Sequence, residues 1–161
     1  MSENSALVKG VNRAWDAGLV VVVAAGNNGP RTMSITTPGI SRKVITVGCS
    51  DDDREVLVGG NRMVDYSGRG PTAACICKPD LVAPGCSVVS CAGRADKYTI
   101  KSGTSMSTPI VSGATALLLE RYPDMTNKDV KLKLRESCTD IGLPRNQQGW
   151  GLLDVEKLVS K

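Results

Sequence analysis

The sequence predicts an α/β domain in which a mainly parallel β-sheet lies between helices. Two short runs, Leu19–Ala25 and Val44–Cys49, are continuously apolar and rich in β-branched residues, which is typical of strands buried on both faces. A helical pattern leads into the first run through a single glycine, as in parallel α/β units. Aromatic residues are only 3% of the 161 residues, so aliphatic side chains must form the core. We expect one domain over residues 1–161.

The first elements are a helix, a strand and a turn. Apolar residues at helical spacing predict an amphipathic helix over Ala6–Ala17, which Gly18 ends. The strand that follows stops at the turn Gly26–Pro30. Loops after the carboxyl ends of parallel strands carry the sites of open α/β sheets, so this turn is either a site or a plain turn. A phosphate-binding loop is a poor fit because no Lys-Ser/Thr follows.

The middle of the chain predicts short extended pieces. Asp51–Asp53 could contribute to a cation site, but a solvated loop is favoured. A short hairpin is expected over Glu55–Val64, around Gly59 and Gly60. Residues 78–85 form an extended segment between turn residues, and a second hairpin pairs residues 87–91 with 97–100 across Gly93-Arg94.

The central helix is expected over Met106–Leu119, which has small or apolar side chains on every face. Such a helix is buried all round. It opens with Gly103, and either Thr104 or Ser105 can cap it. A serine at a helix N-terminus also lies where free N–H groups favour an oxyanion, so Ser105 is a cap or a nucleophile. From the helix alone, the cap is favoured.

The C-terminal part predicts two more helices. Thr126-x-x-Asp129 resembles a capping box and opens a helix that runs to about Cys138. Its basic residues are interpreted as a solvated face: Lys128, Lys131, Lys133 and Arg135. Residues 149–152 form a turn and a short extended piece, and Leu153–Val159 forms a terminal helix.

Composition excludes several function classes. The net charge of +4 is modest and its basic residues are scattered, which argues against nucleic-acid binding. No run is long enough to span a membrane, and the N-terminus lacks a signal-peptide pattern. The six cysteines match no small secreted framework, so we expect reduced thiols in a cytoplasmic protein. A zinc site at Cys75-x-Cys77 is disfavoured because no second pair has ligand spacing.

The sequence contains no histidine. This excludes a histidine general base from these residues, and with it a complete Ser-His-Asp triad.

Three stretches together resemble the subtilisin-like serine proteases (subtilases). Val22–Gly29 is similar to the family's oxyanion-asparagine segment, Gly103–Pro109 to its nucleophile motif, and Asp80–Gly85 to the segment before that motif. Their order is also that of the family, and similar stretches at 66–71, 122–123 and 149–151 extend the likeness over almost the whole chain. Gly103-x-Ser105-x-Ser107 lacks the second glycine of the α/β-hydrolase elbow, so an esterase or lipase is a weaker alternative.

The resemblance implies a three-layer, Rossmann-like subtilisin fold and a serine endopeptidase that acts on proteins or peptides. It implies that Ser105 is the nucleophile and that the Asn27 amide, with the Ser105 N–H, stabilises the oxyanion. Ala24, Ala25 and Gly26 would form one wall of the pocket for the residue before the cleaved bond, with Thr36 or Thr37 near its base. Subtilases often bind calcium, but no complete oxygen cage is visible, so no metal or cofactor is expected.

The chain also departs from the family. A subtilase supplies an Asp and then a His before the oxyanion segment, whereas here that segment lies near the start and no His exists. We therefore expect the C-terminal half of a catalytic domain, incomplete in its sheet, inactive alone, and partnered by a missing N-terminal half. A bare sheet edge would also permit self-association. The alternative is a non-catalytic, truncated or pseudo-protease that binds peptides or assembles with a partner; retained Ser105 and Asn27 favour the enzyme.

Overall fold

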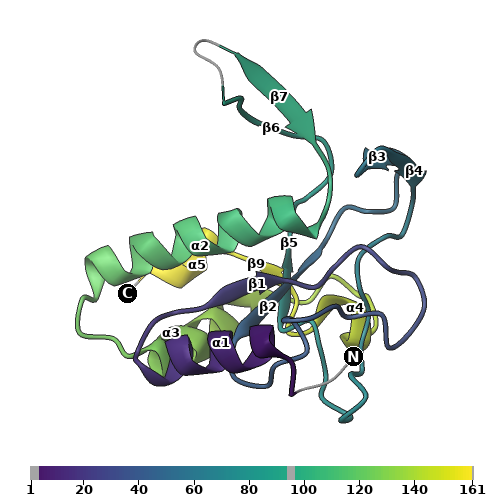
Figure 1. The fold of residues 1–161 in the computed structure, drawn as a ribbon. Helices are drawn as coiled ribbons and strands as arrows, with labels where there is room; N and C mark the ends of the chain where they lie inside the picture. Colours follow the sequence, from purple (N-terminus) through teal and green to yellow (C-terminus); the bar gives the residue numbers. More distant parts are fainter. Residues whose placement is uncertain (1–3, 94–96, 161) are drawn as a thin grey trace.

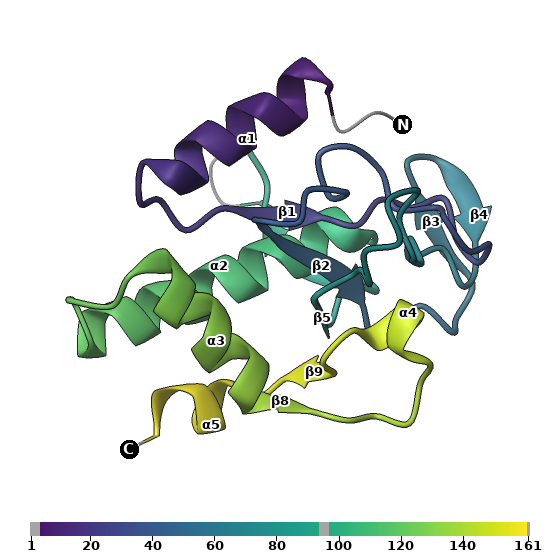
Figure 2. The ribbon, with the colours of Figure 1, turned by 90° about the horizontal axis from the view of Figure 1, so that it is seen from below.

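A five-stranded sheet forms the centre of the computed structural model, which describes residues 4–93 and 97–160 (Figures 1 and 2). The strand order is β1-β2-β5-β9-β8, of which the first four are mutually parallel and β8 is antiparallel to β9. Their bounds are β1 Val22–Ala24, β2 Ile45–Cys49, β5 Leu81–Ala83, β9 Leu152–Leu153 and β8 Cys138–Thr139. The predicted α/β class with a mainly parallel sheet is confirmed.

Five helices within the described residues flank this sheet. Helix α2 (Thr104–Arg121) packs against β1, β2 and β5, and in Figure 1 it lies above the sheet, with α1 (Ala6–Asp16) and α3 (Asn127–Ser137) below. Helix α5 (Val155–Val159) packs against α2 and α3. The short α4 (Arg145–Gln148) was not predicted. The capping box at the start of α3 is present as predicted.

Both predicted hairpins form as antiparallel ribbons. The first pairs β3 (Val56–Val58) with β4 (Asn61–Met63), and the second pairs β6 (Val88–Cys91) with β7 (Tyr98–Lys101). Arg94, in the predicted second turn, lies outside the described residues.

The core is aliphatic, as the composition requires. The extended segment expected over residues 78–85 contains β5, whose three residues are all buried between β2 and β9. One main cluster joins the sheet to α2, α3 and α5, through residues such as Ile45, Leu118 and Leu134. Burial of each such side chain stabilises the fold by about 1.5–3 kcal/mol.

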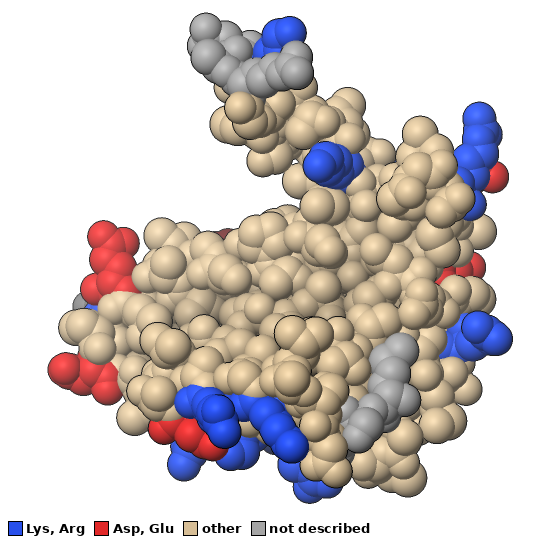
Figure 3. Space-filling view, in the orientation of Figure 1, with Lys and Arg blue, Asp and Glu red and all other residues tan. Residues whose placement is uncertain are grey.

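The prediction that the central helix is buried all round is wrong for one side of α2. That side is exposed, and its residues recur at helical spacing: Ser105, Pro109, Ser112, Gly113, Ala116 and Leu117. Their side chains are small or apolar, as at buried positions, but nothing in residues 4–93 and 97–160 covers them. Figure 3 shows that the centre of the face that looks out in Figure 1, over α2 and β1, is free of charged side chains.

The outer edge of β1 is also uncovered. Within the described part of the chain, β1 pairs only with β2. Its three residues are half-buried, whereas all five residues of β2 are buried. An unpaired edge strand beside an uncharged surface is a position at which further backbone can add to the sheet.

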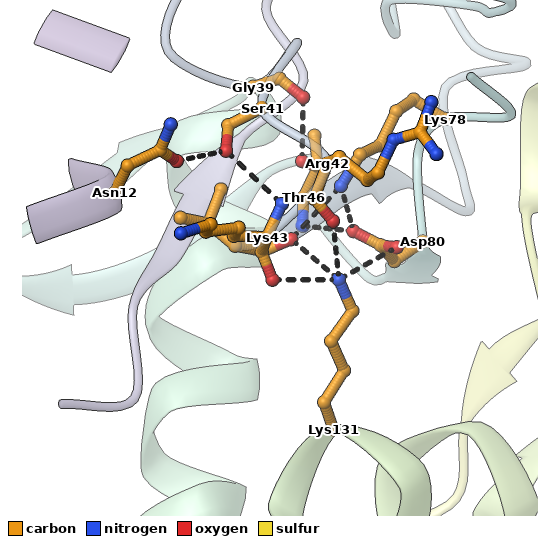
Figure 4. A network of polar contacts seen from close by, with 10 residues as sticks. Asn12, Gly39, Ser41, Arg42, Lys43, Thr46, Lys78, Asp80 and Lys131 are labelled. Carbon is orange, nitrogen blue, oxygen red and sulfur yellow. Dashed lines mark hydrogen bonds and ion pairs between the residues drawn. The ribbon is translucent and has the colours of Figure 1, made fainter. Parts of the chain in front are cut away.

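A buried polar network holds the other end of the sheet, where β2 and β5 begin (Figure 4). The Lys78 ammonium, only 1% exposed, donates to the Val44 carbonyl and to the Asp80 carboxylate. Burial lowers the pKa of Lys78 to about 8, against the opposing attraction of Asp80. Lys131 donates to three carbonyls at 2.9–3.2 Å, including that of Val44, so the prediction that Lys131 lies on a solvated face is wrong. Network contacts thereby tie α3 to the sheet.

None of the helices in residues 4–93 and 97–160 has both the length and the apolarity that crossing a membrane requires.

Candidate active site

The turn after β1 is fixed by backbone hydrogen bonds. Gly26 has φ 94°, which favours glycine, and its N–H donates to the Thr104 hydroxyl at 3.1 Å. The Gly26 carbonyl accepts from the Gly68 N–H at 2.7 Å. Both backbone polar groups of Gly26 are therefore hydrogen-bonded. These bonds fix the backbone from which Asn27 projects.

The Asn27 side chain reaches the start of α2. Its Oδ1 accepts from both the N–H and the hydroxyl of Thr104, each at 3.0 Å. A side chain at Gly103 would approach the Asn27 Nδ2 at 3.2 Å, so glycine keeps this space open. Because Oδ1 is engaged by the helix, the amide NH₂ of Asn27 is oriented and serves as a donor.

Helix α2 begins without a side-chain cap. Its N-cap residue is Gly103, with φ 141°, and no side chain caps the helix there. The interpretation of Thr104 or Ser105 as the cap is therefore wrong: both lie in the first turn. The N–H of Thr104 donates to Asn27 and that of Met106 to the Gly103 carbonyl at 2.8 Å. Between them, the Ser105 N–H makes no hydrogen bond within residues 4–93 and 97–160, as expected for a helix start.

The structure brings Ser105 and Asn27 together in one hollow of about 410 Å³. Ser105 is exposed and Asn27 is half-buried. The remaining lining comes from the β3–β4 turn, the end of β7 and the first turn of α2: Leu57, Val58, Gly59, Gly60, Ile100, Lys101, Ser102 and Met106. A serine at a helix start and an asparagine with an oriented amide therefore line the same hollow.

Asp51 supports the segment that leads into α2. Its carboxylate accepts from the N–H groups of Gly85 and Cys86 at 2.7 and 3.1 Å. The Gly85 carbonyl in turn accepts from the Gly103 N–H at 2.9 Å. Asp51 was expected in a solvated loop; instead it fixes the segment that leads to the helix.

Asp52 contradicts the same expectation. It is 3% exposed and its carboxylate accepts from the Ser67 N–H at 2.7 Å. Burial raises the pKa of Asp52. Of the three aspartates, only Asp53 is exposed. Sequence spacing gave no sign of these partners, because Gly85 and Ser67 lie far along the chain.

The residues predicted to form a pocket wall, Ala24–Gly26, are one continuous segment at the end of β1. Ala25 is buried, and Ala24 and Gly26 are half-buried. Thr36 lies against this wall: its N–H donates to the Ala25 carbonyl at 2.8 Å, and its side chain occupies the space that a Cβ on Gly26 would need. Thr37 is half-buried and makes no hydrogen bond to the wall in the described part of the chain. Of the two threonines, Thr36 is the one in contact.

Among the described residues that line the hollow, Lys101 is the one with an ionisable side chain. Burial raises the pKa of the Cys49 thiol to about 12, so it stays protonated and unreactive. All six cysteines are free. The sequence contains no histidine. In residues 4–93 and 97–160, no group of three or more His, Cys, Asp or Glu side chains is arranged to hold a metal ion.

Comparison with known proteins identifies the family. The model of the Subtilase family (Peptidase_S8) matches residues 1–151. The chain belongs to the subtilase family. Its relatives include Serine protease AprX of Bacillus subtilis (strain 168), 42% identical over 83% of this chain, and Subtilisin DY of Bacillus licheniformis, 35% identical over 96% of it. These subtilases are longer: the chain spans 33% of AprX and 52% of Subtilisin DY.

The subtilase fold is also seen in a solved structure. The chain superposes on the Prenylagaramide maturation protease PagA with a TM-score of 0.72, at 24% identity, covering 94% of this chain and 53% of the other. At this identity the likeness shows the fold alone. The subtilase family consists of serine endopeptidases, and the matched residues 1–151 include Asn27 and Ser105.

Proposed function

We propose that this chain carries the nucleophile and oxyanion donors of a subtilisin-type serine endopeptidase, and that a segment outside these 161 residues supplies the catalytic Asp and His. The observation that carries the proposal is the shared hollow: the exposed Ser105 hydroxyl and the Asn27 amide line it together. A protein or peptide is the substrate.

In the proposed reaction, the Ser105 Oγ attacks the carbonyl carbon of the peptide bond, and its proton passes to the imidazole of the absent histidine. The carbonyl π electrons move to oxygen, which becomes an oxyanion. In this proposal, the Asn27 NH₂ and the Ser105 N–H donate to that oxygen; the support is that Thr104 engages the Asn27 Oδ1 and that no side chain caps α2. The oxyanion electrons then re-form the carbonyl while the C–N bond breaks, and the histidine gives its proton to the leaving amine. Water hydrolyses the resulting acyl-enzyme. Without the base, the Ser105 hydroxyl is a weak nucleophile.

Three observations support a docking face for the missing segment. The outer edge of β1 has no strand partner among the described residues, and the exposed side of α2 is small and apolar. The surface between them carries no charge (Figure 3). The matched relatives are about two to three times as long as the matched region, so a segment of this size exists in them. We infer that it adds a strand to β1 and covers α2.

Co-expression tests this proposal. The chain would be produced with the part of AprX that precedes the matched region, and casein hydrolysis measured. We expect activity from the pair, none from either part, and none from the pair with Ser105→Ala. A co-purifying but inactive pair would contradict the enzymatic reading.

The alternative is a non-catalytic module, for which the bare β1 edge is the supporting observation. Such an edge invites self-association. Sedimentation of the chain, alone and with the preceding part of AprX, separates the two functions. A homodimer that persists when the AprX segment is added favours the non-catalytic module. A homodimer that dissociates and binds the AprX segment favours the enzyme.

A further inference from the structure

The β6–β7 hairpin presents a continuous apolar face. Val89 lies directly opposite Ile100, and Cys91 opposite Tyr98. Alternate residues of a strand share a face, and so do directly opposed residues, so these four side chains lie on one side of the ribbon. Val89, Tyr98 and Ile100 are 61%, 74% and 66% exposed.

This ribbon stands away from the rest of the molecule (Figure 1). A two-stranded hairpin without a packing surface is only marginally stable in water. In soluble proteins, a contiguous exposed apolar face usually marks a binding surface. Within residues 4–93 and 97–160, no element covers the exposed three.

The face is continuous with the hollow at Ser105. Ile100 belongs to both: it pairs with Val89 on the ribbon and lines the hollow with Ser105 and Leu57. The wall for the residue before the cleaved bond, Ala24–Gly26, does not line this hollow. If Ala24–Gly26 holds the residue before the cleaved bond, as the resemblance implies, the hollow is left for the part of the substrate that follows that bond, and Ile100 connects it to the ribbon.

We propose that the apolar face of β6–β7 binds the substrate segment that follows the cleaved bond, and that it selects segments with large aliphatic side chains. An extended peptide advances about 3.3 Å per residue, so Ile100 and Tyr98, two positions apart, lie within reach of residues roughly two to four beyond the bond. Among the described residues β7 pairs only with β6, so its other edge can pair with such a strand. This inference deepens the proposed function and rests on it for the identity of the ligand.

The test uses the whole chain and two acetylated, amidated peptides, SALVL and SASNS. Amide shifts are followed by ¹H–¹⁵N NMR. We expect SALVL, and not SASNS, to shift the amides of β6 and β7. The double variant Val89→Thr/Ile100→Thr keeps β-branched side chains and should bind SALVL roughly tenfold more weakly. Leu132→Gln, which removes an exposed apolar side chain of α3, should bind it unchanged.

Three binding results would each overturn the inference: SALVL shifts that avoid the ribbon, equal binding by the double variant, or equal binding of both peptides. Unchanged β2 and α2 signals show that the double variant is folded. A homodimer that the double variant abolishes would also overturn it, because a second copy then covers the face. This test can fail independently of the proposed function. Peptide binding at the ribbon without casein hydrolysis by the reconstituted pair would keep the binding surface and refute the enzyme. Casein hydrolysis without peptide binding at the ribbon would refute only the binding surface.

Discussion

The Thr104 hydroxyl is expected to hold the Asn27 amide in its working orientation. It donates to the Asn27 Oδ1 at 3.0 Å and accepts from the Gly26 N–H at 3.1 Å. Thr104→Val keeps the shape of the side chain and removes both hydrogen bonds. The Thr104 N–H remains bonded to Asn27, whereas the Gly26 N–H loses its partner.

The cost follows from these two bonds. An unsatisfied, partly buried donor costs about 1–3 kcal/mol, so we expect the free energy of unfolding to fall by that amount. Urea denaturation of the isolated chain measures it. In the reconstituted enzyme, a less ordered Asn27 should lower kcat roughly tenfold, which corresponds to about 1.4 kcal/mol of transition-state stabilisation.

Thr104→Ser is the matched control, because it keeps the hydroxyl and loses only a methyl group. It should lie within about 1 kcal/mol of the wild type in stability and retain activity. Equal stability and equal kcat for Thr104→Val and the wild type would refute the reasoning that this hydroxyl positions the asparagine.

Three further predictions concern separate parts of the molecule. Asn27→Ala should lower kcat of the reconstituted enzyme by about 10²–10³, a loss known for one such donor in a subtilisin; a loss below threefold in steady-state casein assays would remove Asn27 from the oxyanion site. Gly26→Ala should destabilise the chain by more than about 1 kcal/mol, because φ is positive and Thr36 occupies the Cβ position, whereas Gly113→Ala, in open helical space, should stabilise it by about 0.5–1 kcal/mol; urea titration of both variants decides, and a tolerated Gly26→Ala contradicts the packing. Burial lowers the pKa of Lys78 to about 8, so between pH 8 and 10 the unfolded chain binds more protons than the folded chain. The free energy of unfolding, measured by urea titration, should therefore rise with pH in this window and be lost as pH falls through 8. Lys78→Met should flatten this pH profile, and parallel profiles for the variant and the wild type would show that Lys78 is not the titrating group.

Local patterns predicted most elements of the fold, but not α4 or β8. The apolar runs gave β1 and β2, glycines marked both hairpins, and Thr126-x-x-Asp129 marked the start of α3. Each signal lies within a few residues of the structure it specifies. Propensity, turn chemistry and capping act at that range, so one sequence is sufficient to read them.

Long-range partners could not be predicted. The cap of α2 is a glycine because the Asn27 amide, 76 positions away, occupies the space beside it. Asp51 looked solvated because its partner Gly85 lies 34 positions along the chain. The exposed side of α2 was misread for a different reason: its side chains are those of a buried helix, but burial depends on what covers it.

Labelling of Ser105 by a fluorophosphonate tests the central claim most directly, because the reagent reports whether this hydroxyl becomes nucleophilic beside an oxyanion donor. The adduct would be located by mass spectrometry in the isolated chain and in the chain paired with the preceding part of AprX. The account predicts rapid modification of Ser105 in the pair, slow modification in the isolated chain, and slow modification of the paired Asn27→Ala variant. Rapid modification of the isolated chain, or an adduct on another residue of the pair, would contradict it.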